Sequence, residues 1–402
     1  MWRSTVSATA VTLALAACGS DGRGDAGGVA TTADTIVTAT PITVDQIDAS
    51  PPAVTASGLD IVAGESVDGA PEPLVDPSEI RSGGPPPDGI PSIDDPTFLS
   101  PSAVDFLAEN EPVVAVEVDG DARAYPIQIL MWHELVNDTI GGVPVTISYC
   151  PLCNSAVAYD RRLDDRVLEF GTSGRLWNSA LVMYDRQTET LWSHFTAQGI
   201  VGELTGEELQ TLPVATVPWG VWRSANPDGL VLSRDTGVER DYGRNPYLGY
   251  DDVDGTPFLF DGEVDGRYTA MTRIVGVEVE GDAVAVPLAS LREARVVEAE
   301  VGGIEVVVLW QAGTASALDA DDVAAGADVG ATGVFVPVVD GRRLDFGPAD
   351  DGFVDAQTGS TWNILGEASA GPLAGTRLDA VAHVDTFWFA WGAFLPDTEI
   401  VD

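Results

Sequence analysis

The chain has 402 residues, and 45% of them are hydrophobic, which is enough to fill the cores of two domains of ordinary size. Its formal net charge is −43, and all 20 basic residues are arginines. A surface this acidic repels the phosphates of DNA and RNA, so we expect no nucleic-acid partner. The composition leaves the identity of a small-molecule or protein partner open.

The segment 1–18 resembles a bacterial lipoprotein signal peptide. A basic start at Arg3 is followed by an apolar run, Val6–Ala17, that is too short to span a bilayer as a helix. The run ends in Leu15-Ala16-Ala17-Cys18-Gly19, in which Cys18 is the predicted lipidation site. An ordinary secretory signal with an incidental cysteine is the alternative. Both interpretations predict an extracytoplasmic protein, and the first predicts that a lipid on Cys18 anchors it to the cell membrane.

Residues 19–95 are predicted to form a disordered, acidic tether between this signal and the folded body. The segment is rich in Gly, Pro, Ala, Thr and Asp, and a run such as Gly83–Gly89 cannot hold a helix or a central strand. Such a composition is typical of flexible spacers. Its later part, from Ile80 to Phe98, can lie against the folded body.

The remainder of the chain repeats itself. The string Val114–Ala122 reappears as Val275–Ala283, and the same offset holds without a gap as far as Ser155-Ala156 and its counterpart Ser316-Ala317. Later strings match at a slightly larger offset, as Trp219 does with Trp388. We therefore predict two tandem homologous units, 111–250 and 272–402, joined by a connector over 251–271.

Each unit is predicted to have an α+β fold. Residues 113–118 alternate as a strand does, and Asp119-Gly120-Asp121 is typical of a turn. Pro126 suits the start of a short helix that runs to Leu135. Residues 143–149 form the next expected strand. The pattern predicts a mixed, mostly antiparallel sheet with one or two short helices in each unit.

Thiols and imidazoles are scarce, which concentrates the chemical question on a few positions. Beyond Cys18, the sequence has two cysteines, in the string Cys150-Pro151-Leu152-Cys153, and three histidines, His133, His194 and His383. At the repeat offset, the second unit keeps neither cysteine and neither of the first two histidines. We therefore predict one working site, in the first unit, with the second, degenerate unit as its support.

The first hypothesis for this site is a soft-metal centre. A Cys-x-x-Cys string presents both sulfurs to one side of a turn, and His133 or His194 would complete three or four ligands with Cys150 and Cys153. Sulfur with imidazole suits copper or zinc, for metal handling or metal-assisted chemistry. Additional candidates are Glu134, which would orient a ligating His133, Arg175, in a loop suited to binding an anion, and His383.

Two alternatives use the same cysteines. In a thiol–disulfide oxidoreductase, Cys150 and Cys153 would cycle between dithiol and disulfide, and their place after a strand resembles that of a thioredoxin-type pair. In a non-catalytic binding or scaffold protein, they would form a structural disulfide, although so small a loop gains little stability from closure. The sequence does not decide among the three hypotheses, nor whether the protein is an enzyme.

Several uncommon strings of the first unit occur in an order that resembles the bacterial family DUF3179, a domain of unknown function. They are Tyr125-Pro126, His133-Glu134, Asn137-Asp138, Tyr149–Ser155, Phe170–Gly174, Asn178-Ser179, Met183–Arg186 and Thr190–Ser193. The resemblance covers most of residues 111–270. It implies an exported or membrane-anchored bacterial protein, and it supports the choice of site without naming a reaction.

Overall fold

The computed structural model describes residues 71–402. The predicted signal peptide, the lipidation site at Cys18 and the first part of the predicted tether lie outside the described residues. Within 71–402, we find no helix with the length and apolar character needed to cross a membrane.

The described residues are mostly β: 41% lie in strands and 11% in helices. The prediction of an α+β fold is therefore wrong. Each α-helix in this part of the chain is only about two turns long and begins directly after a strand. The helices are too short to form a layer of their own. They are α1 (Ile127–His133), α2 (Trp219–Ala225), α3 (Leu288–Ala294) and α4 (Trp388–Phe394), with 3₁₀ turns η3 (Pro77–Glu79), η4 (Pro101–Ala103) and η5 (Val323–Ala325).

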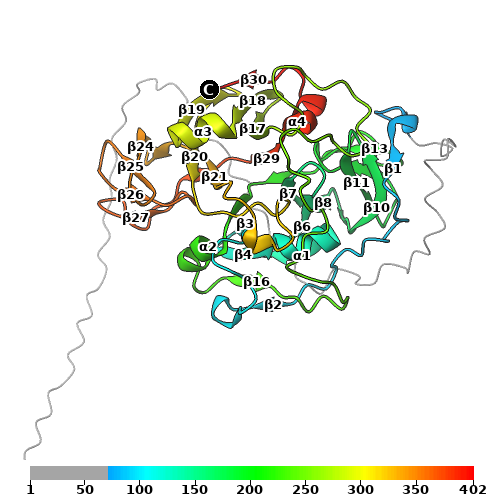
Figure 1. Ribbon diagram of the computed structural model, residues 1–402, viewed down its shortest axis with the longest axis horizontal. Helices are drawn as coiled ribbons and strands as arrows, with labels where there is room; N and C mark the ends of the chain where they lie inside the picture. Colours follow the sequence, from blue (N-terminus) through cyan, green and yellow to red (C-terminus); the bar gives the residue numbers. More distant parts are fainter. Residues whose placement is uncertain (1–70) are drawn as a thin grey trace, which may run out of the picture. The chain divides into compact units, whose positions relative to one another are not determined.

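The first part of the described chain forms three larger sheets and a two-stranded hairpin (Figure 1). In spatial order, the strands of the first sheet are β1 (Arg81–Ser82), β10 (Phe170–Trp177), β11 (Ala180–Asp185), β12 (Leu191–Ser193) and β13 (Gly199–Val201). Those of the second are β14 (Thr211–Leu212), β7 (Ser155–Asp160), β6 (Val143–Cys150) and β5 (Leu135–Ile140). Those of the third are β15 (Ala215–Pro218), β3 (Pro112–Val118), β4 (Asp121–Pro126), β16 (Leu230–Leu232) and β2 (Phe98–Leu99), and the hairpin is β8 (Arg162–Leu163) and β9 (Arg166–Val167).

The second part also forms three larger sheets and a hairpin. The strands of the first are β29 (Val384–Phe387), β17 (Arg273–Val279), β18 (Asp282–Pro287) and β30 (Glu399–Ile400). Those of the second are β19 (Val296–Val301), β20 (Ile304–Gln311), β21 (Ala331–Val336) and β28 (Asp379–Ala380). Those of the third are β24 (Phe346–Pro348), β25 (Phe353–Asp355), β26 (Thr361–Trp362) and β27 (Ala368–Ala370), and the hairpin is β22 (Val338–Val339) and β23 (Arg342–Arg343).

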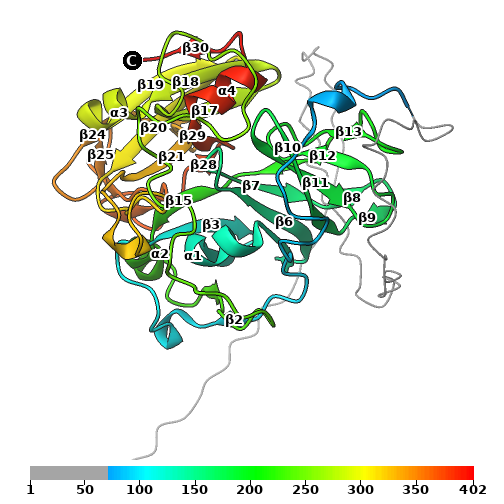
Figure 2. The same cartoon turned by 45° about the vertical axis from the view of Figure 1, so that its right-hand side comes forward.

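The repeat in the sequence corresponds to a repeat of elements. The run β3–β4–α1–β5–β6 recurs as β17–β18–α3–β19–β20, and every element of the second run follows its counterpart at the same offset as the repeated strings. Figure 2 shows α1 beside β3 and β6, the strands it contacts. The two runs nevertheless do not form separate units, because they share hydrophobic cores. One core holds Tyr149 together with Trp388, and another holds Trp219 together with Trp362. The prediction of two tandem units is corrected in this respect.

Residues 71–98, which include the end of the predicted tether, lie against the first-part sheets. β1 pairs with β10, β2 pairs with β16, and Ile93 forms an isolated bridge with Val136 of β5 (Figure 1). We call residues 87–98 the strap. The strap also reaches His133, one of the predicted site histidines.

Candidate functional site

Cys150 and Cys153 lie at the two ends of a tight hairpin turn. Cys150 ends β6 and pairs with Ser155, the first residue of β7. The turn between them is closed by a hydrogen bond from the Asn154 N–H to the Pro151 carbonyl, 3.3 Å long, and Asn154 adopts φ 52°. Both cysteines are free, with 1% of Cys150 and 0% of Cys153 exposed. The structure therefore holds two buried thiols on one turn.

A chain of polar contacts leads from Cys153 to His194. The Cys153 sulfur lies 3.1 Å from Ser155 Oγ, and this oxygen lies 2.7 Å from His194 Nε2. The other ring nitrogen, Nδ1, lies 2.7 Å from Ser148 Oγ. Tyr159 donates a hydrogen bond to the His194 carbonyl and fixes the backbone there. Burial lowers the pKa of His194 to about 3, so the ring is neutral at physiological pH and has one donor and one acceptor nitrogen.

The environments of the two thiols differ. The Leu181 N–H, on β11, points at the Cys150 sulfur with a nitrogen-to-sulfur distance of 3.4 Å. The Cys150 sulfur therefore has a backbone hydrogen-bond donor beside it. Burial raises the pKa of the Cys153 thiol, and the neighbouring Cys150 raises it further. Cys153 therefore keeps its proton in the resting dithiol.

The second part of the chain holds the cysteine turn in place. Thr386 Oγ1 and the Phe387 N–H, both on β29, donate hydrogen bonds of 2.7 Å and 3.1 Å to the Cys153 carbonyl. The repeat position of Cys153 in the second part is Thr314, which has no thiol. The second part contributes support at this turn, and both thiols belong to the first part.

His133 does not reach the cysteines. It is the last residue of α1, and its ring is buried. Nδ1 lies 2.7 Å from the carbonyl of Pro91 in the strap, and Nε2 lies 2.5 Å from the Tyr242 hydroxyl. Burial lowers the pKa of His133. Both ring nitrogens are thus used to tie the strap and the Tyr242 loop to α1.

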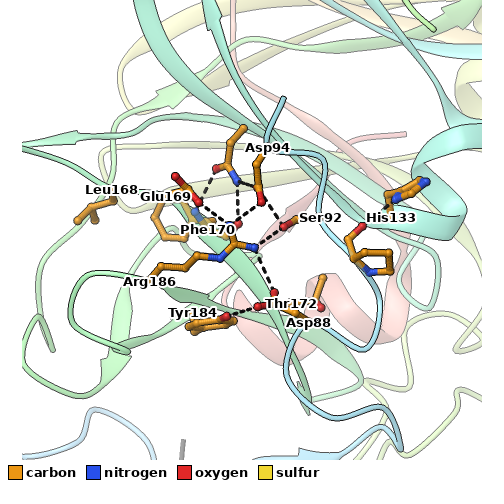
Figure 3. Close-up of polar contacts among 12 residues, drawn as sticks. Asp88, Ser92, Asp94, His133, Leu168, Glu169, Phe170, Thr172, Tyr184 and Arg186 are labelled. Carbon is orange, nitrogen blue, oxygen red and sulfur yellow. Dashed lines mark hydrogen bonds and ion pairs between the residues drawn. The ribbon is translucent and has the colours of Figure 1, made fainter. Parts of the chain in front are cut away.

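Arg186 ties the same strap to the strands beside it. Its guanidinium pairs with Asp88 at 3.3 Å, with Asp94 at 2.5 Å and with Glu169. Figure 3 shows Arg186 pointing into this group of carboxylates, with His133 beside the next part of the strap. The charged side chains of this cluster pair with one another, and their role is to attach the strap to the neighbouring strands.

Glu134 has an unusual backbone and an unpartnered side chain. It adopts φ 60°, donates from its N–H to the Leu130 carbonyl, and accepts from the Tyr149 N–H. Its repeat counterpart Arg295 has φ 65° and the matching backbone hydrogen bonds, so the backbone form belongs to the fold. Arg295 donates to two carbonyls, whereas the Glu134 carboxyl has no hydrogen bond or ion pair within residues 71–402. Burial raises the pKa of Glu134 to about 8.

The other two additional candidates, Arg175 and His383, have contacts that do not involve the thiols. Arg175, on β10, is half-buried, forms no ion pair with the residues the structure describes, and has its pKa lowered by burial. His383 Nδ1 lies 3.0 Å from the Val381 carbonyl. His383 lines a groove of about 360 Å³ that also includes Val116 and Phe335. Neither residue contacts Cys150 or Cys153.

The predicted metal ligands come together only in part. Cys150 and Cys153 share one turn, His194 is separated from them by Ser155, and His133 is committed elsewhere. Between residues 71 and 402, no three or more His, Cys, Asp or Glu side chains are grouped as ligands of one ion would be. The cysteine pair alone offers two soft donors.

Sequence reasoning missed the two serines that hold His194. Their signal was present, because Ser148 and Ser155 flank the cysteine string at alternate positions, one on each side. In strands this spacing places side chains on one face. Because β6 pairs with β7, this spacing places Ser148 and Ser155 on one shared polar face.

Comparisons with known proteins add the family and nothing on chemistry. No match was found among curated proteins or among solved structures. The family model described as a protein of unknown function, DUF3179, matches residues 87–398, from the start of the strap almost to the end of the chain. The chain therefore belongs to the DUF3179 family.

Proposed function

We propose that this protein is a thiol–disulfide oxidoreductase, anchored outside the cytoplasm by a lipid on Cys18, with Cys150 and Cys153 as its redox pair. The observation that carries the proposal is the contact chain from Cys153 through Ser155 to His194, beside a second free thiol. Two adjacent thiols can donate two electrons together by forming one disulfide. The contact chain gives one of them a path for its proton.

The reaction begins at Cys150. Its thiolate attacks one sulfur of an external disulfide, a new bond forms between that sulfur and Cys150, and the other sulfur leaves as a thiolate. The Leu181 N–H, 3.4 Å from the Cys150 sulfur, stabilises the attacking thiolate. This step produces a mixed disulfide between the substrate and Cys150.

Cys153 completes the exchange. Ser155 accepts the Cys153 proton while it passes its own proton to His194 Nε2, and the Cys153 thiolate attacks the Cys150 sulfur. The Cys150–Cys153 bond forms and the second substrate sulfur leaves. Because burial lowers the pKa of His194 to about 3, the ring does not keep this proton, which ends on the departing substrate thiolate. Two protein thiols are oxidised and one external disulfide is reduced to two thiols.

The activation differs from that of a thioredoxin-type pair. There, the first thiol lies at the N-terminus of a helix. Here the pair spans a turn between antiparallel strands β6 and β7, with no helix between Cys150 and Ser155. A single backbone donor and the serine–histidine chain take the place of the helix.

Trapping of the mixed disulfide tests this proposal. Cys153→Ser should accumulate a stable adduct of a small disulfide on Cys150, because the resolving thiol is gone. Cys150→Ser should form little adduct, because the protonated, buried Cys153 is a poor nucleophile. Intact mass measurement identifies the adduct. If both variants form the adduct at the same rate, and no faster than a cysteine in an unfolded control peptide, the result would contradict an active pair.

A soft-metal site remains the second candidate, on the observation that both free sulfurs share one turn. Copper or zinc would be held by Cys150 and Cys153, since thiolates are preferred ligands of such ions. Elemental analysis of protein purified without added metal tests it. About one metal ion per chain, lost in Cys153→Ser and retained in His133→Ala, would favour this candidate over the redox pair.

A further inference from the structure

The segment between β16 and β17, residues 233–272, contains no helix or strand. Connections of this length without regular structure are uncommon and are usually functional. We call its central part, residues 243–262, the cover loop. Three of its side chains, Tyr247, Tyr250 and Phe260, pack against the hydrophobic core that contains both cysteines.

The cover loop is held against this core from both parts of the chain. On one side, the N–H groups of Gly249 and Tyr250 donate to the carbonyls of Asp319 and Leu318, at 3.0 Å and 3.2 Å. On the other, Ser179 Oγ donates to the Phe258 carbonyl at 2.5 Å. Ser179 lies just before Leu181, whose N–H contacts the Cys150 sulfur.

The electrostatics agree with this placement. Burial raises the pKa of Tyr250 to about 12. The Tyr250 hydroxyl in turn accepts a hydrogen bond of 3.0 Å from the Phe258 N–H. Tyr250 thus packs against the core that holds the thiols, and its hydroxyl ties residues 250–258 together.

The outer side of the same loop is unusually apolar. Six large hydrophobic side chains are exposed in residues 71–402, and four of them belong to the cover loop. These four are Leu248 at 65%, Val253 at 52%, Phe258 at 48% and Leu259 at 41% exposed. Single exposed hydrophobic residues are normal, whereas a concentration in one segment marks an interaction surface.

Acidic side chains accompany these apolar residues. Asp252 and Asp254 lie between Leu248 and Phe258, and neither forms an ion pair with another described residue. Carboxylates here repel anionic lipid headgroups, which argues against membrane contact. With a net charge of −43, a second copy of the chain would be repelled as well. The complementary surface is an apolar face bordered by Lys and Arg.

We propose that the cover loop is the docking surface for a redox partner protein, whose reactive cysteine lies in an apolar face bordered by basic side chains. This inference rests on the proposed function, because the partner exchanges electrons with the Cys150–Cys153 pair. Contact with Leu248, Phe258 and Leu259 places the partner above the thiols. Since the thiols are buried, docking on the loop that covers them couples recognition to access.

The test compares two reductants on the oxidised full-length protein. One is a thioredoxin-fold dithiol protein with a basic surface, and the other is dithiothreitol. The variant Leu248→Ser/Phe258→Ser/Leu259→Ser removes apolar side chains from the cover loop. The matched control Leu74→Ser/Val338→Ser removes the two other exposed large hydrophobic side chains. The measurement is the second-order rate of disulfide reduction.

We expect the cover-loop variant to lose roughly tenfold or more in rate with the protein reductant. It should keep its rate with dithiothreitol, and the control should keep both rates. Added salt should slow the protein reductant with the unmodified chain. An unchanged rate with the protein reductant, or an equal loss with dithiothreitol, overturns the docking surface alone. If neither reductant acts because no Cys150–Cys153 disulfide forms, the proposed function fails and the docking surface with it.

Discussion

Ser155 Oγ lies 2.7 Å from His194 Nε2 and, on its other side, 3.1 Å from the Cys153 sulfur. The hydroxyl therefore connects a thiol to an imidazole that does not touch it. This relationship carries the proton in the proposed reaction, and it is the first to be tested by substitution.

Ser155→Ala removes the connection while leaving both thiols. We expect closure of the Cys150–Cys153 disulfide from a mixed disulfide to slow by roughly a hundredfold, the usual effect of losing a general acid–base group. Rapid mixing with mass detection of the closed form measures the rate. Ser148→Ala, which removes the contact at the other ring nitrogen, is the control and should slow closure much less. Equal closure rates in Ser155→Ala and the unmodified protein would remove the proton path from the mechanism.

His194 should make the protein sensitive to acid. Burial lowers its pKa from 6.5 to about 3, so the unfolded chain binds a proton on this ring at a higher pH than the folded protein does. Stability therefore falls as the pH falls from about 6.5 to about 3, by at most about 5 kcal/mol from this group. Denaturant unfolding over this range should show a shallower pH dependence in His194→Gln. The same slope in both proteins would mean that the folded ring has the same pKa as the ring in the unfolded chain.

Glu134 should act in the opposite direction. Burial raises its pKa from 4.5 to about 8, so the folded protein holds this proton to a higher pH than the unfolded chain does. Stability is then lost as the pH rises from about 4.5 to about 8, by up to about 5 kcal/mol. Glu134→Gln should be more stable than the unmodified protein at about pH 8 and similar at about pH 4. Arg295→Gln, at the matching backbone position, is the control. A Glu134→Gln protein that is less stable at about pH 8 would show that the carboxylate has a partner.

His133 should contribute to the stability of the fold and should not affect the redox potential of the thiols. His133→Ala leaves the Pro91 carbonyl without its partner, whereas the Tyr242 hydroxyl keeps its contact with Thr236 Oγ1 at 2.7 Å, so the expected cost is about 1–3 kcal/mol of unfolding free energy. The redox potential of the Cys150–Cys153 pair should not change. Tyr242→Phe, which removes the hydroxyl's contacts with His133 and Thr236 and keeps the contact of His133 with Pro91, should leave the potential unchanged as well. A potential that shifts in His133→Ala as it does in His194→Gln would return His133 to the thiol site.

Local features of the fold were predictable because they depend on neighbouring residues. The expected strand at 113–118 is β3, the helix expected after Pro126 is α1, and the expected strand at 143–149 is β6. The constant offset between the repeated strings also reappears in the order of elements. The predicted fold class was wrong because alternating patterns predict individual strands but do not show which sheets pack against one another. Trp219 and Trp362 share a core although they are far apart in sequence.

The spacing of Cys150 and Cys153 predicts that they share one turn, as they do, whereas the spacing of the histidines does not predict which of them lies beside that turn. His133 lies closer to Cys150 in sequence than His194 does, yet its ring is held by Pro91 and Tyr242. His194 is brought to the turn because it follows β12, which pairs with β11, whose Leu181 contacts Cys150. These long-range pairings are set by packing, and sequence spacing does not contain them.

A redox titration of the full-length protein tests the central claim most directly. The protein is equilibrated with mixtures of reduced and oxidised dithiothreitol, the remaining thiols are alkylated, and the products are weighed by intact mass. We predict that Cys150 and Cys153 lose their thiols together, in one reversible transition that Cys150→Ser and Cys153→Ser each abolish. Thiols that remain free under every mixture, or that are protected by a bound metal ion until a chelator removes it, would contradict the redox pair.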